Sequence, residues 1–275
     1  MNLYSCLGMS YVDSDDLKEL GRTGERISAI GLGTFGIRSK EKAREALIKA
    51  LELGINQIDT AEMYSTESLV GEVARAFGRE EVFITTKLLP ERFTSREEAL
   101  GAAKQSMRRL GLSYADLILI HWPNERVSIE EQVRNLEAIA NEGLCRYIGV
   151  SNFNLTELRV ALSSISKHEI VVNQVKYSVL DREIEKDLLP FCVEQGVTIQ
   201  AYTPLEGGRV SESRFLKAIA ERYGKTPVQV ALNYLISKPR VTAISKTERV
   251  ERVEEFKGAM GWRLSPEDIE LISRS

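Results

Sequence analysis

Short apolar segments alternate with longer amphipathic segments along most of the chain. The longer segments repeat apolar residues at the spacing of one helix face, whereas the apolar segments have the length of buried strands. We expect strands at Ile30–Thr34, Ile55–Asp59, Val82–Thr86, Asp116–Ile120, Tyr147–Val150, Val171–Gln174, Val197–Ala201 and Val241–Ile244. We expect helices between them, among others at Lys40–Leu53, Arg96–Leu110, Ile129–Asn141, Glu183–Glu194 and Thr226–Ile236. This alternation predicts an α/β fold with parallel strands.

Several of the predicted helices end in a glycine that precedes a strand. Gly54, Gly143 and Gly196 stand at these points, where glycine adopts the left-handed conformation that ends a helix at little cost. Successive strands lie roughly 24 to 45 residues apart, about the length of a βαβ unit. Eight such units without a linker predict a single closed (β/α)8 TIM barrel, and a doubly wound parallel sheet is the main alternative.

The region before the first barrel strand carries a separate signal. Between Lys18 and Ser28, two glycines flank a polar turn, which is typical of a short β-hairpin. We expect this hairpin to close the bottom of the barrel. Residues 1–16 lack the basic start and apolar stretch of a secretory signal, so we interpret them as an N-terminal extension of a single domain that spans residues 17–275.

Composition and charge favour a globular protein that binds neither nucleic acid nor membranes. The chain has 275 residues, which suits one α/β barrel of about 250 residues. Charged residues make up 28%, hydrophobic residues 43%, and the formal net charge is −3. No apolar run approaches the roughly 18 residues of a membrane helix. Cys6, Cys145 and Cys192 form no CxxC pair and suit a reducing compartment. We therefore expect a cytoplasmic monomer without a metal.

The segment from Gly31 to Gly36 matches the GxGxxG pattern of dinucleotide-binding folds. It follows a predicted strand, and Asp59 lies about 26 residues beyond Gly33. However, the next helix is expected to start near Lys40, beyond the last glycine, so its N-terminus would not meet a pyrophosphate. A doubly wound domain would also leave the eight similar units unexplained. We therefore favour the barrel.

Polar residues follow the predicted strands at nearly every carboxyl end. In α/β barrels these ends meet at one mouth, where the active site is built. A single polar residue at such a point is more often a helix cap or a solvated side chain. The set as a whole predicts a site and consists of Thr34, Asp59, Lys87, His121, Ser151, Asn152, Gln174, Tyr202, Thr203 and Lys246.

Three of these strand ends are neighbours in a barrel and carry Asp59, Lys87 and His121, while Tyr64 lies in the loop after Asp59. An ammonium beside a phenol favours the phenolate and lowers a phenol pKa that is ordinarily about 10. A neighbouring aspartate keeps the lysine charged and oriented. We expect Tyr64 to exchange a proton with a carbonyl or alcohol oxygen, and His121 to hydrogen-bond that oxygen. Singly, each residue has an ordinary structural interpretation; at adjacent strand ends they favour chemistry.

The sequence resembles the aldo-keto reductase family over residues 17–272. The matching segments, in the family's order, are Gly31–Thr34, Asp59–Tyr64, Thr86–Lys87, His121–Pro123, Ile148–Phe153, Asn173–Gln174 and Ala201–Leu205. The resemblance implies a barrel enzyme with a catalytic tetrad of Asp59, Tyr64, Lys87 and His121, in which Tyr64 donates the proton. Such an NADP(H)-dependent oxidoreductase would reduce aldehydes or ketones, or oxidise alcohols or sugars, by hydride transfer.

The resemblance also assigns contacts to the nicotinamide cofactor. Ser151, Asn152 and Gln174 match residues that hydrogen-bond the carboxamide, and Tyr202 matches the aromatic residue that stacks on the ring. A glycine-rich loop that includes Gly208 would let the backbone approach the diphosphate. Further cofactor contacts are implied at Gly33, Thr34, Asp59, Thr203, Pro204, Leu205, Gly207, Ile244 and Ser245.

The segment from Lys246 to Arg252 combines basic residues with the expected start of the last helix, an arrangement that binds anions. The resemblance assigns Lys246, Thr247 and Arg252 to the 2′-phosphate of adenosine, and arginine can bind a phosphate bidentately. We therefore expect NADP(H) rather than NAD(H). The resemblance assigns Glu255 to the adenine. Phe256 stands where the family has asparagine, which removes one amide contact.

An apolar pocket is expected over the tetrad, with walls at Phe35, Met63, Leu88 and Trp122. The loop of residues 123–128 is short, so the pocket is expected to be open to many small carbonyl compounds. The sequence leaves the physiological substrate and the direction of the reaction open.

Three other functions are alternatives to a reductase. Lys87 could form a Schiff base in an aldolase of the same fold. A barrel of this kind could also serve as a regulatory subunit that binds NADP and turns over slowly, although the intact tetrad favours catalysis. A metal-dependent hydrolase is disfavoured because His121 and His168 are too few for a multi-histidine site.

Overall fold

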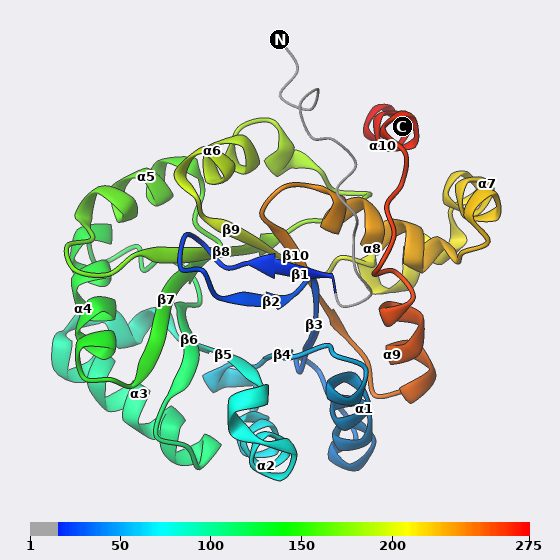
Figure 1. The fold of residues 1–275 in the computed structure, drawn as a ribbon. Helices are drawn as coiled ribbons and strands as arrows, with labels where there is room; N and C mark the ends of the chain where they lie inside the picture. Colours follow the sequence, from blue (N-terminus) through cyan, green and yellow to red (C-terminus); the bar gives the residue numbers. More distant parts are fainter. Residues whose placement is uncertain (1–15) are drawn as a thin grey trace.

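The computed structural model describes residues 16–275 and places a closed parallel barrel at the centre of the molecule (Figure 1). Consecutive strands pair in parallel, and the last strand pairs with the first to close the barrel. The strands are β3 (Ile30–Gly33), β4 (Gln57–Asp59), β5 (Phe83–Leu88), β6 (Ala115–Ile120), β7 (Cys145–Ser151), β8 (Ile170–Lys176), β9 (Thr198–Tyr202) and β10 (Val241–Lys246). Each predicted strand overlaps one of these. The expected (β/α)8 TIM barrel is confirmed, and the doubly wound alternative is wrong.

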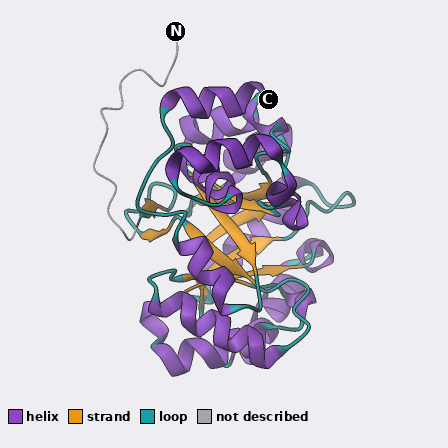
Figure 2. Ribbon diagram, turned by 90° about the vertical axis from the view of Figure 1, so that its right-hand side faces the viewer, coloured by secondary structure: helices purple, strands orange, loops and turns teal. Residues whose placement is uncertain are grey.

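Helices surround the barrel on its outer side (Figures 1 and 2). They are α1 (Lys40–Glu52), α2 (Glu67–Phe77), α3 (Arg96–Leu110), α4 (Ile129–Asn141), α5 (Leu155–Ser164), α6 (Leu188–Gln195), α7 (Arg214–Tyr223), α8 (Pro227–Ser237), α9 (Val250–Lys257) and α10 (Pro266–Arg274). The helix predicted from Glu183 is divided into a 3-10 turn and α6, because the Asp187 carboxylate accepts a hydrogen bond from the Leu188 N–H and starts a new helix there. The segment after β10 was expected to open the last helix. Instead, α9 begins only at Val250, and α10 follows it.

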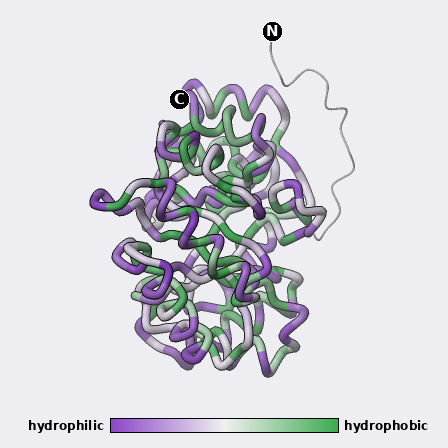
Figure 3. Tube along the Cα trace, turned by 90° about the vertical axis from the view of Figure 1, so that its left-hand side faces the viewer, coloured by the Kyte–Doolittle hydropathy of each residue, from purple (hydrophilic) through white to green (hydrophobic). Residues whose placement is uncertain are grey.

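Side chains along the strands face alternately into the barrel and toward the helices. On β6, Leu117 and Leu119 belong to a cluster inside the barrel, whereas Ile118 and Ile120 pack in the layer between strands and helices. The helices turn their apolar faces to that layer, as Ala43, Ala46 and Leu47 do on α1. In Figure 3 the hydrophobic segments accordingly gather at the centre and the hydrophilic ones at the periphery.

A short antiparallel hairpin of β1 (Leu17–Glu19) and β2 (Arg26–Ser28) crosses one end of the barrel (Figure 1). Leu20 and Ile27 of this hairpin are fully buried and pack inside the barrel with residues near the starts of the strands, such as Phe83 and Val171. The Gly21 N–H donates to Thr198 Oγ1 at 2.8 Å, at the start of β9. The expected hairpin is therefore present at the bottom of the barrel, opposite the carboxyl ends of the strands.

The N-terminal extension lies mostly outside the described residues, which begin at Asp16. We assigned Asp16 to the extension, yet its buried carboxylate pairs with Arg263 at 2.6 Å, and its carbonyl accepts from the Ala29 N–H at 2.9 Å. Within residues 16–275, no helix is both long and apolar enough to span a membrane. In the same part of the chain Cys145 and Cys192 are buried free thiols.

The glycine pattern that begins within β3 has a packing role in the fold. A Cβ on Gly31 would lie 2.3 Å from the Cγ atom of Gln57 inside the barrel, so glycine is required for that close approach. Helix α1 begins at Lys40, after an N-cap at Ser39, and thus beyond Gly36 as expected.

Candidate functional site

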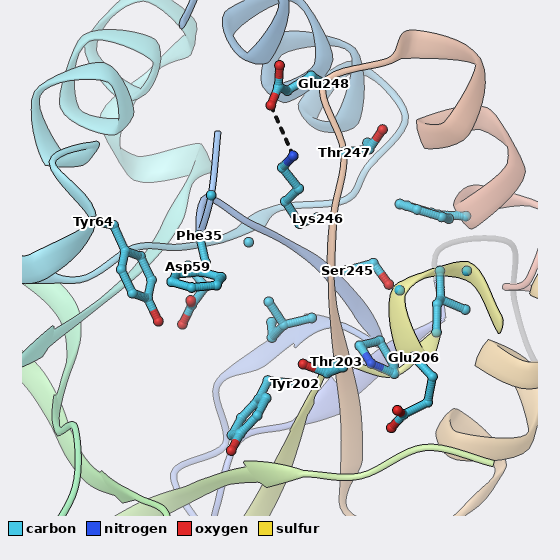
Figure 4. A pocket seen from close by; sticks show the side chains of 18 of the residues that line it. Phe35, Asp59, Tyr64, Tyr202, Thr203, Glu206, Ser245, Lys246, Thr247 and Glu248 are labelled. Atoms are coloured by element: carbon cyan, nitrogen blue, oxygen red, sulfur yellow. Dashed lines mark ion pairs between the residues drawn. The ribbon is translucent and has the colours of Figure 1, made fainter. Parts of the chain in front are cut away.

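A cavity of about 920 Å³ opens at the carboxyl ends of the barrel strands (Figure 4). It runs from the ends of β4 and β6 to the loop between β10 and α9. Most of the residues expected at the site line it, namely Gly33, Phe35, Asp59, Met63, Tyr64, His121, Trp122, Ser151, Asn152, Gln174, Tyr202, Thr203, Pro204, Leu205, Gly207, Ile244, Ser245, Lys246, Thr247 and Arg252. The prediction that polar strand ends meet at one mouth therefore agrees with the cavity.

Asp59, Tyr64 and His121 line the floor of this cavity, and Lys87 lies buried directly beneath it. The Lys87 ammonium donates to Asp59 Oδ1 at 2.6 Å and to the Thr60 carbonyl at 3.0 Å, and both charged side chains are buried. The Lys87 nitrogen also lies 4.9 Å from the centre of the Tyr64 ring. The Tyr64 hydroxyl lies 3.2 Å from Nε2 of His121. The cluster thus joins a phenol and an imidazole above a buried ion pair.

The loop after β4 holds Tyr64 over the ion pair. Tyr64 ends a 3-10 turn that starts at Glu62, and Ser65 follows it in a left-handed conformation with φ of 58°. The Glu62 carboxylate accepts from the Leu89 N–H at 3.2 Å and from Arg92 Nε at 3.0 Å, which ties the turn to the end of β5. Figure 4 shows the Tyr64 ring beside Asp59 as a result.

Burial determines the protonation of the cluster. It raises the pKa of Tyr64 above its ordinary value, and the Asp59 carboxylate raises it further. Burial lowers the pKa of Lys87, which the contact with Asp59 opposes. Burial and then the nearby Lys87 lower the pKa of His121 to about 3. The expectation that the pKa of Tyr64 lies below its ordinary value is therefore wrong, because desolvation outweighs any effect of the Lys87 ammonium. At neutral pH, Tyr64 carries its proton and His121 is neutral.

His121 is held in place from two sides. The Trp122 ring stacks on the imidazole at a centroid distance of 3.8 Å and an angle of 13°. The Asn152 amide donates to the His121 carbonyl at 2.9 Å. Because Asn152 has a φ of 62° and accepts a hydrogen bond from the Tyr202 hydroxyl at 2.8 Å, the ends of β6, β7 and β9 are joined across the cavity floor.

A chain of buried amides leads from Asp59 down the barrel interior. Gln174 donates through Nε2 to Asp59 Oδ2 at 2.8 Å and to Gln200 Oε1 at 3.1 Å. Gln200 in turn donates to Gln57 Oε1 at 3.2 Å, and Gln57 donates to the Ser28 carbonyl. Both hydrogens of the Gln174 amide are therefore engaged, and its Oε1 atom remains for a ligand. Sequence reasoning missed Gln57 and Gln200, although an amide within an apolar strand is a signal for such a chain.

The opposite end of the cavity is basic. Lys246 and Arg252 line it, together with Arg38, Lys42 and Arg249, which the sequence analysis did not name. These three additional residues lie in the loop after β3, at the start of α1 and just before α9, so only the closed barrel brings them to the same place.

Two assigned residues near this end have other roles. Glu255 does not line the cavity; it accepts from Arg252 Nη1 at 2.5 Å and from Thr226 Oγ1 at 2.8 Å, so it orients the arginine. Phe256, the replacement for the family's asparagine, lines the cavity with Val228 and forms an apolar wall there.

Besides Lys87, two other assigned residues do not reach the cavity. Thr34 is fully buried, and its hydroxyl bonds to the Asp59 carbonyl at 3.0 Å and to Thr66 at 2.8 Å. Leu88 is fully buried in the layer between strands and helices. Neighbouring residues on a strand face opposite sides, so Lys87 and Leu88 cannot both point toward the barrel axis. The assignment of Leu88 to a pocket wall therefore disagrees with the structure, and Thr34 supports Asp59 from behind.

The remaining expected walls form an exposed apolar rim. Phe35 is 65% exposed, Met63 48% and Trp122 38%, which is unusual for large apolar side chains. Phe35 also packs edge-on against the Tyr64 ring at a centroid distance of 5.1 Å. The entrance to the tetrad is thus apolar and open. Within residues 16–275, no group of three or more potential metal-ligating His, Cys, Asp or Glu side chains occurs.

Comparison with known proteins connects this geometry to one family. A family model described as "Aldo/keto reductase family" matches residues 29–275. Methylglyoxal reductase DkgB of Escherichia coli O157:H7 is 34% identical, over 90% of this chain and 92% of its own length. Glyoxal reductase of Bacillus subtilis (strain 168) is 35% identical, over 90% of this chain and 89% of its own length.

Solved structures are similar over the same extent. A thermostable aldo-keto reductase crystallised with the inhibitor epalrestat has a TM-score of 0.89 and 42% identity, covering 94% of this chain and 98% of that one. An aldo/keto reductase from Klebsiella pneumoniae in complex with NADP and acetate has a TM-score of 0.87 and 31% identity, covering 94% of both chains.

Proposed function

Because this chain belongs to the aldo/keto reductase family, we propose that it reduces small aldehydes or ketones with NADPH and that Tyr64 donates the proton. The observation that carries the proposal is the cluster at the cavity floor, where the Tyr64 hydroxyl lies 3.2 Å from His121 above the Lys87–Asp59 pair. Relatives are named as methylglyoxal and glyoxal reductases, and a similar structure contains NADP.

The donor set of the cavity fits NADP(H). The free Oε1 atom of Gln174 can accept from a carboxamide at the tetrad end, and the Tyr202 ring offers a flat surface there. In the middle, Gly207 and Gly208 have positive φ values of 65° and 99°, a conformation that exposes backbone to a diphosphate. The cations at the far end, among them Arg252, match the charge of a 2′-phosphate. When bound, NADPH supplies the hydride.

The tetrad supplies the proton. Burial keeps Tyr64 protonated at neutral pH, so its hydroxyl can donate to a carbonyl oxygen as the carbon of that group becomes reduced. Neutral His121 can donate a second hydrogen bond to the same oxygen through Nε2. The Lys87 ammonium beside the ring stabilises the phenolate that remains, and Asp59 holds the ammonium there. In the reverse direction the Tyr64 phenolate would accept the proton of an alcohol, while His121 would bond to the alcohol oxygen.

The rim favours small uncharged carbonyl compounds as substrates. Phe35, Met63 and Trp122 surround the entrance to the tetrad with apolar surface, whereas the basic residues lie at the other end of the cavity. An aldolase is disfavoured, because the Lys87 side chain is 1% exposed and its nitrogen donates to Asp59 and to the Thr60 carbonyl beneath the floor. A regulatory subunit that binds NADP and turns over slowly remains the second candidate function. Rapid turnover of a carbonyl substrate would decide against it.

The test is oxidation of NADPH in the presence of a panel of aldehydes and ketones that includes methylglyoxal and glyoxal. We expect turnover with some of them, and we expect Tyr64→Phe to lower kcat about 10²- to 10⁴-fold, the range of a positioned proton donor. Tyr114→Phe is the matched control. Tyr114 lies just before β6, at the end of the barrel opposite the cavity, and its hydroxyl bonds to Glu80. Both variants should retain NADP⁺ binding. A Tyr64→Phe protein that reduces aldehydes at the parent rate would disprove the mechanism.

A further inference from the structure

A carboxylate of the protein itself occupies the basic end of the cavity. Glu248, in the loop between β10 and α9, accepts from the Arg38 N–H at 2.8 Å and from the Ser39 N–H at 3.1 Å. The same side chain pairs with the Lys246 ammonium at 3.0 Å (Figure 4). Two backbone amides at the start of α1 and one ammonium are the donors that an external anion would also seek.

Glu248 is held firmly in this position. Its side chain is 15% exposed, and each of its oxygens accepts at least one backbone hydrogen bond from the loop after β3. The Arg38 N–H, with help from Lys246 and the Ser39 N–H, lowers the pKa of Glu248 to about 2, so the side chain is an anion throughout the neutral range. A ligand that enters this end of the cavity therefore meets a fixed negative charge among the cations.

We propose that Glu248 is a specificity-determining residue that weakens the binding of the 2′-phosphate and so moderates the preference of this enzyme for NADPH over NADH. The inference rests on the proposed function, which assigns Lys246 to that phosphate. A phosphate on Lys246 shares one ammonium with the Glu248 carboxylate, so the two anions lie within the reach of a single amino group. Their repulsion opposes the phosphate, and it is absent for a cofactor that has a 2′-hydroxyl.

The contacts of Glu248 could also have a purely structural role. Glu248 joins the loop after β3 to the loop after β10, and both loops line the cavity. If the contact only held the two loops together, its loss would weaken the binding of every adenine nucleotide to the same extent. Repulsion acts on the 2′-phosphate alone. A pair of ligands that differ in this phosphate therefore distinguishes the two roles.

The experiment compares 2′,5′-ADP with 5′-AMP, and NADP⁺ with NAD⁺, by calorimetric titration of the parent protein and of Glu248→Gln at low salt. The amide removes the charge and keeps one oxygen, which can accept from one of the two backbone N–H groups, while the other N–H loses its acceptor. We expect Glu248→Gln to bind 2′,5′-ADP and NADP⁺ about fivefold more tightly, while 5′-AMP and NAD⁺ change less than about twofold. Glu254→Gln is the matched control, because its carboxylate is 58% exposed on α9, pairs with Lys49 outside the cavity and does not line the cavity.

Each outcome bears on the inference. A gain confined to the two phosphorylated ligands supports it. Equal changes for all four ligands, a loss for all four, or no change at all would overturn it. If the parent protein binds 2′,5′-ADP no more tightly than 5′-AMP, the result speaks against NADP(H) as the cofactor. The inference about Glu248 then stands only if Glu248→Gln binds 2′,5′-ADP more tightly than 5′-AMP. The two failures can thus be told apart.

Discussion

The two ends of the cavity hold their charges in opposite ways. At the tetrad end, Lys87 and Asp59 are 1% and 4% exposed, and both bond to groups inside the barrel. At the basic end, the side chains of Lys246 and Arg252 are 39% and 42% exposed, and each pairs with one nearby glutamate. The first arrangement belongs to the barrel interior, and the second to the end of β10, the loop after it and α9.

The buried charges at the tetrad end therefore contribute to folding as well as to the site, whereas the exposed charges at the basic end contribute mainly to binding. A buried charge that loses its partner is costly, so the tetrad ion pair and the amide chain beneath it are part of the folded state as well as of the site. Exposed charges are screened by solvent and salt, so the basic end can change its affinity with little effect on stability. Mutations at the two ends should therefore affect different measurements.

The largest effect on stability is expected for Lys87→Met. This change leaves the Asp59 carboxylate buried without its cation and should lower the free energy of unfolding by about 3–5 kcal/mol. Urea denaturation of the variant and of Lys186→Met makes the comparison, since Lys186 pairs with Glu183 on the surface, where both side chains are more than 70% exposed. The control should stay within about 0.5 kcal/mol of the parent. Equal, small losses in both variants would show that the buried pair is not part of what holds the fold.

A smaller effect is expected for Gln200→Met. The substitution keeps the length of the side chain but leaves Gln57 Oε1 and one hydrogen of the Gln174 amide without partners, which should cost about 1–3 kcal/mol. Gln105→Met on the exposed side of α3 is the control, with no loss expected. If thermal unfolding placed both variants at the same midpoint, the amide chain would be dispensable for stability.

The smallest effect is expected for Arg252→Ala, and it concerns binding. Removal of a partly exposed guanidinium should weaken NADPH binding about tenfold and change NADH binding less than about twofold, with no measurable loss of stability. Fluorescence titration with both cofactors measures this, with Arg274→Ala on the exposed end of α10 as control. Equal losses for NADPH and NADH would contradict the assignment of Arg252 to the 2′-phosphate.

Local patterns in the sequence were sufficient for the architecture and for the position of the site. Apolar segments such as Asp116–Ile120 predict buried strands, and glycines such as Gly196 predict the ends of helices. Both signals depend only on neighbouring residues, so they can be recognised in the sequence. The carboxyl ends of parallel strands meet by the geometry of any closed barrel. For that reason the sequence is sufficient to predict Asp59, Lys87 and His121 at one mouth.

The sequence by itself determined the barrel, its hairpin and the residue types at its mouth. The tertiary structure alone decided that Leu88 faces the helices and that burial raises the pKa of Tyr64. It also decided that the Glu248 carboxylate pairs with Lys246 and accepts hydrogen bonds from the backbone just before α1. These properties depend on distance and on exclusion of water between segments far apart in the chain. Side-chain type and local spacing contain neither quantity, because both arise only when the strands have closed.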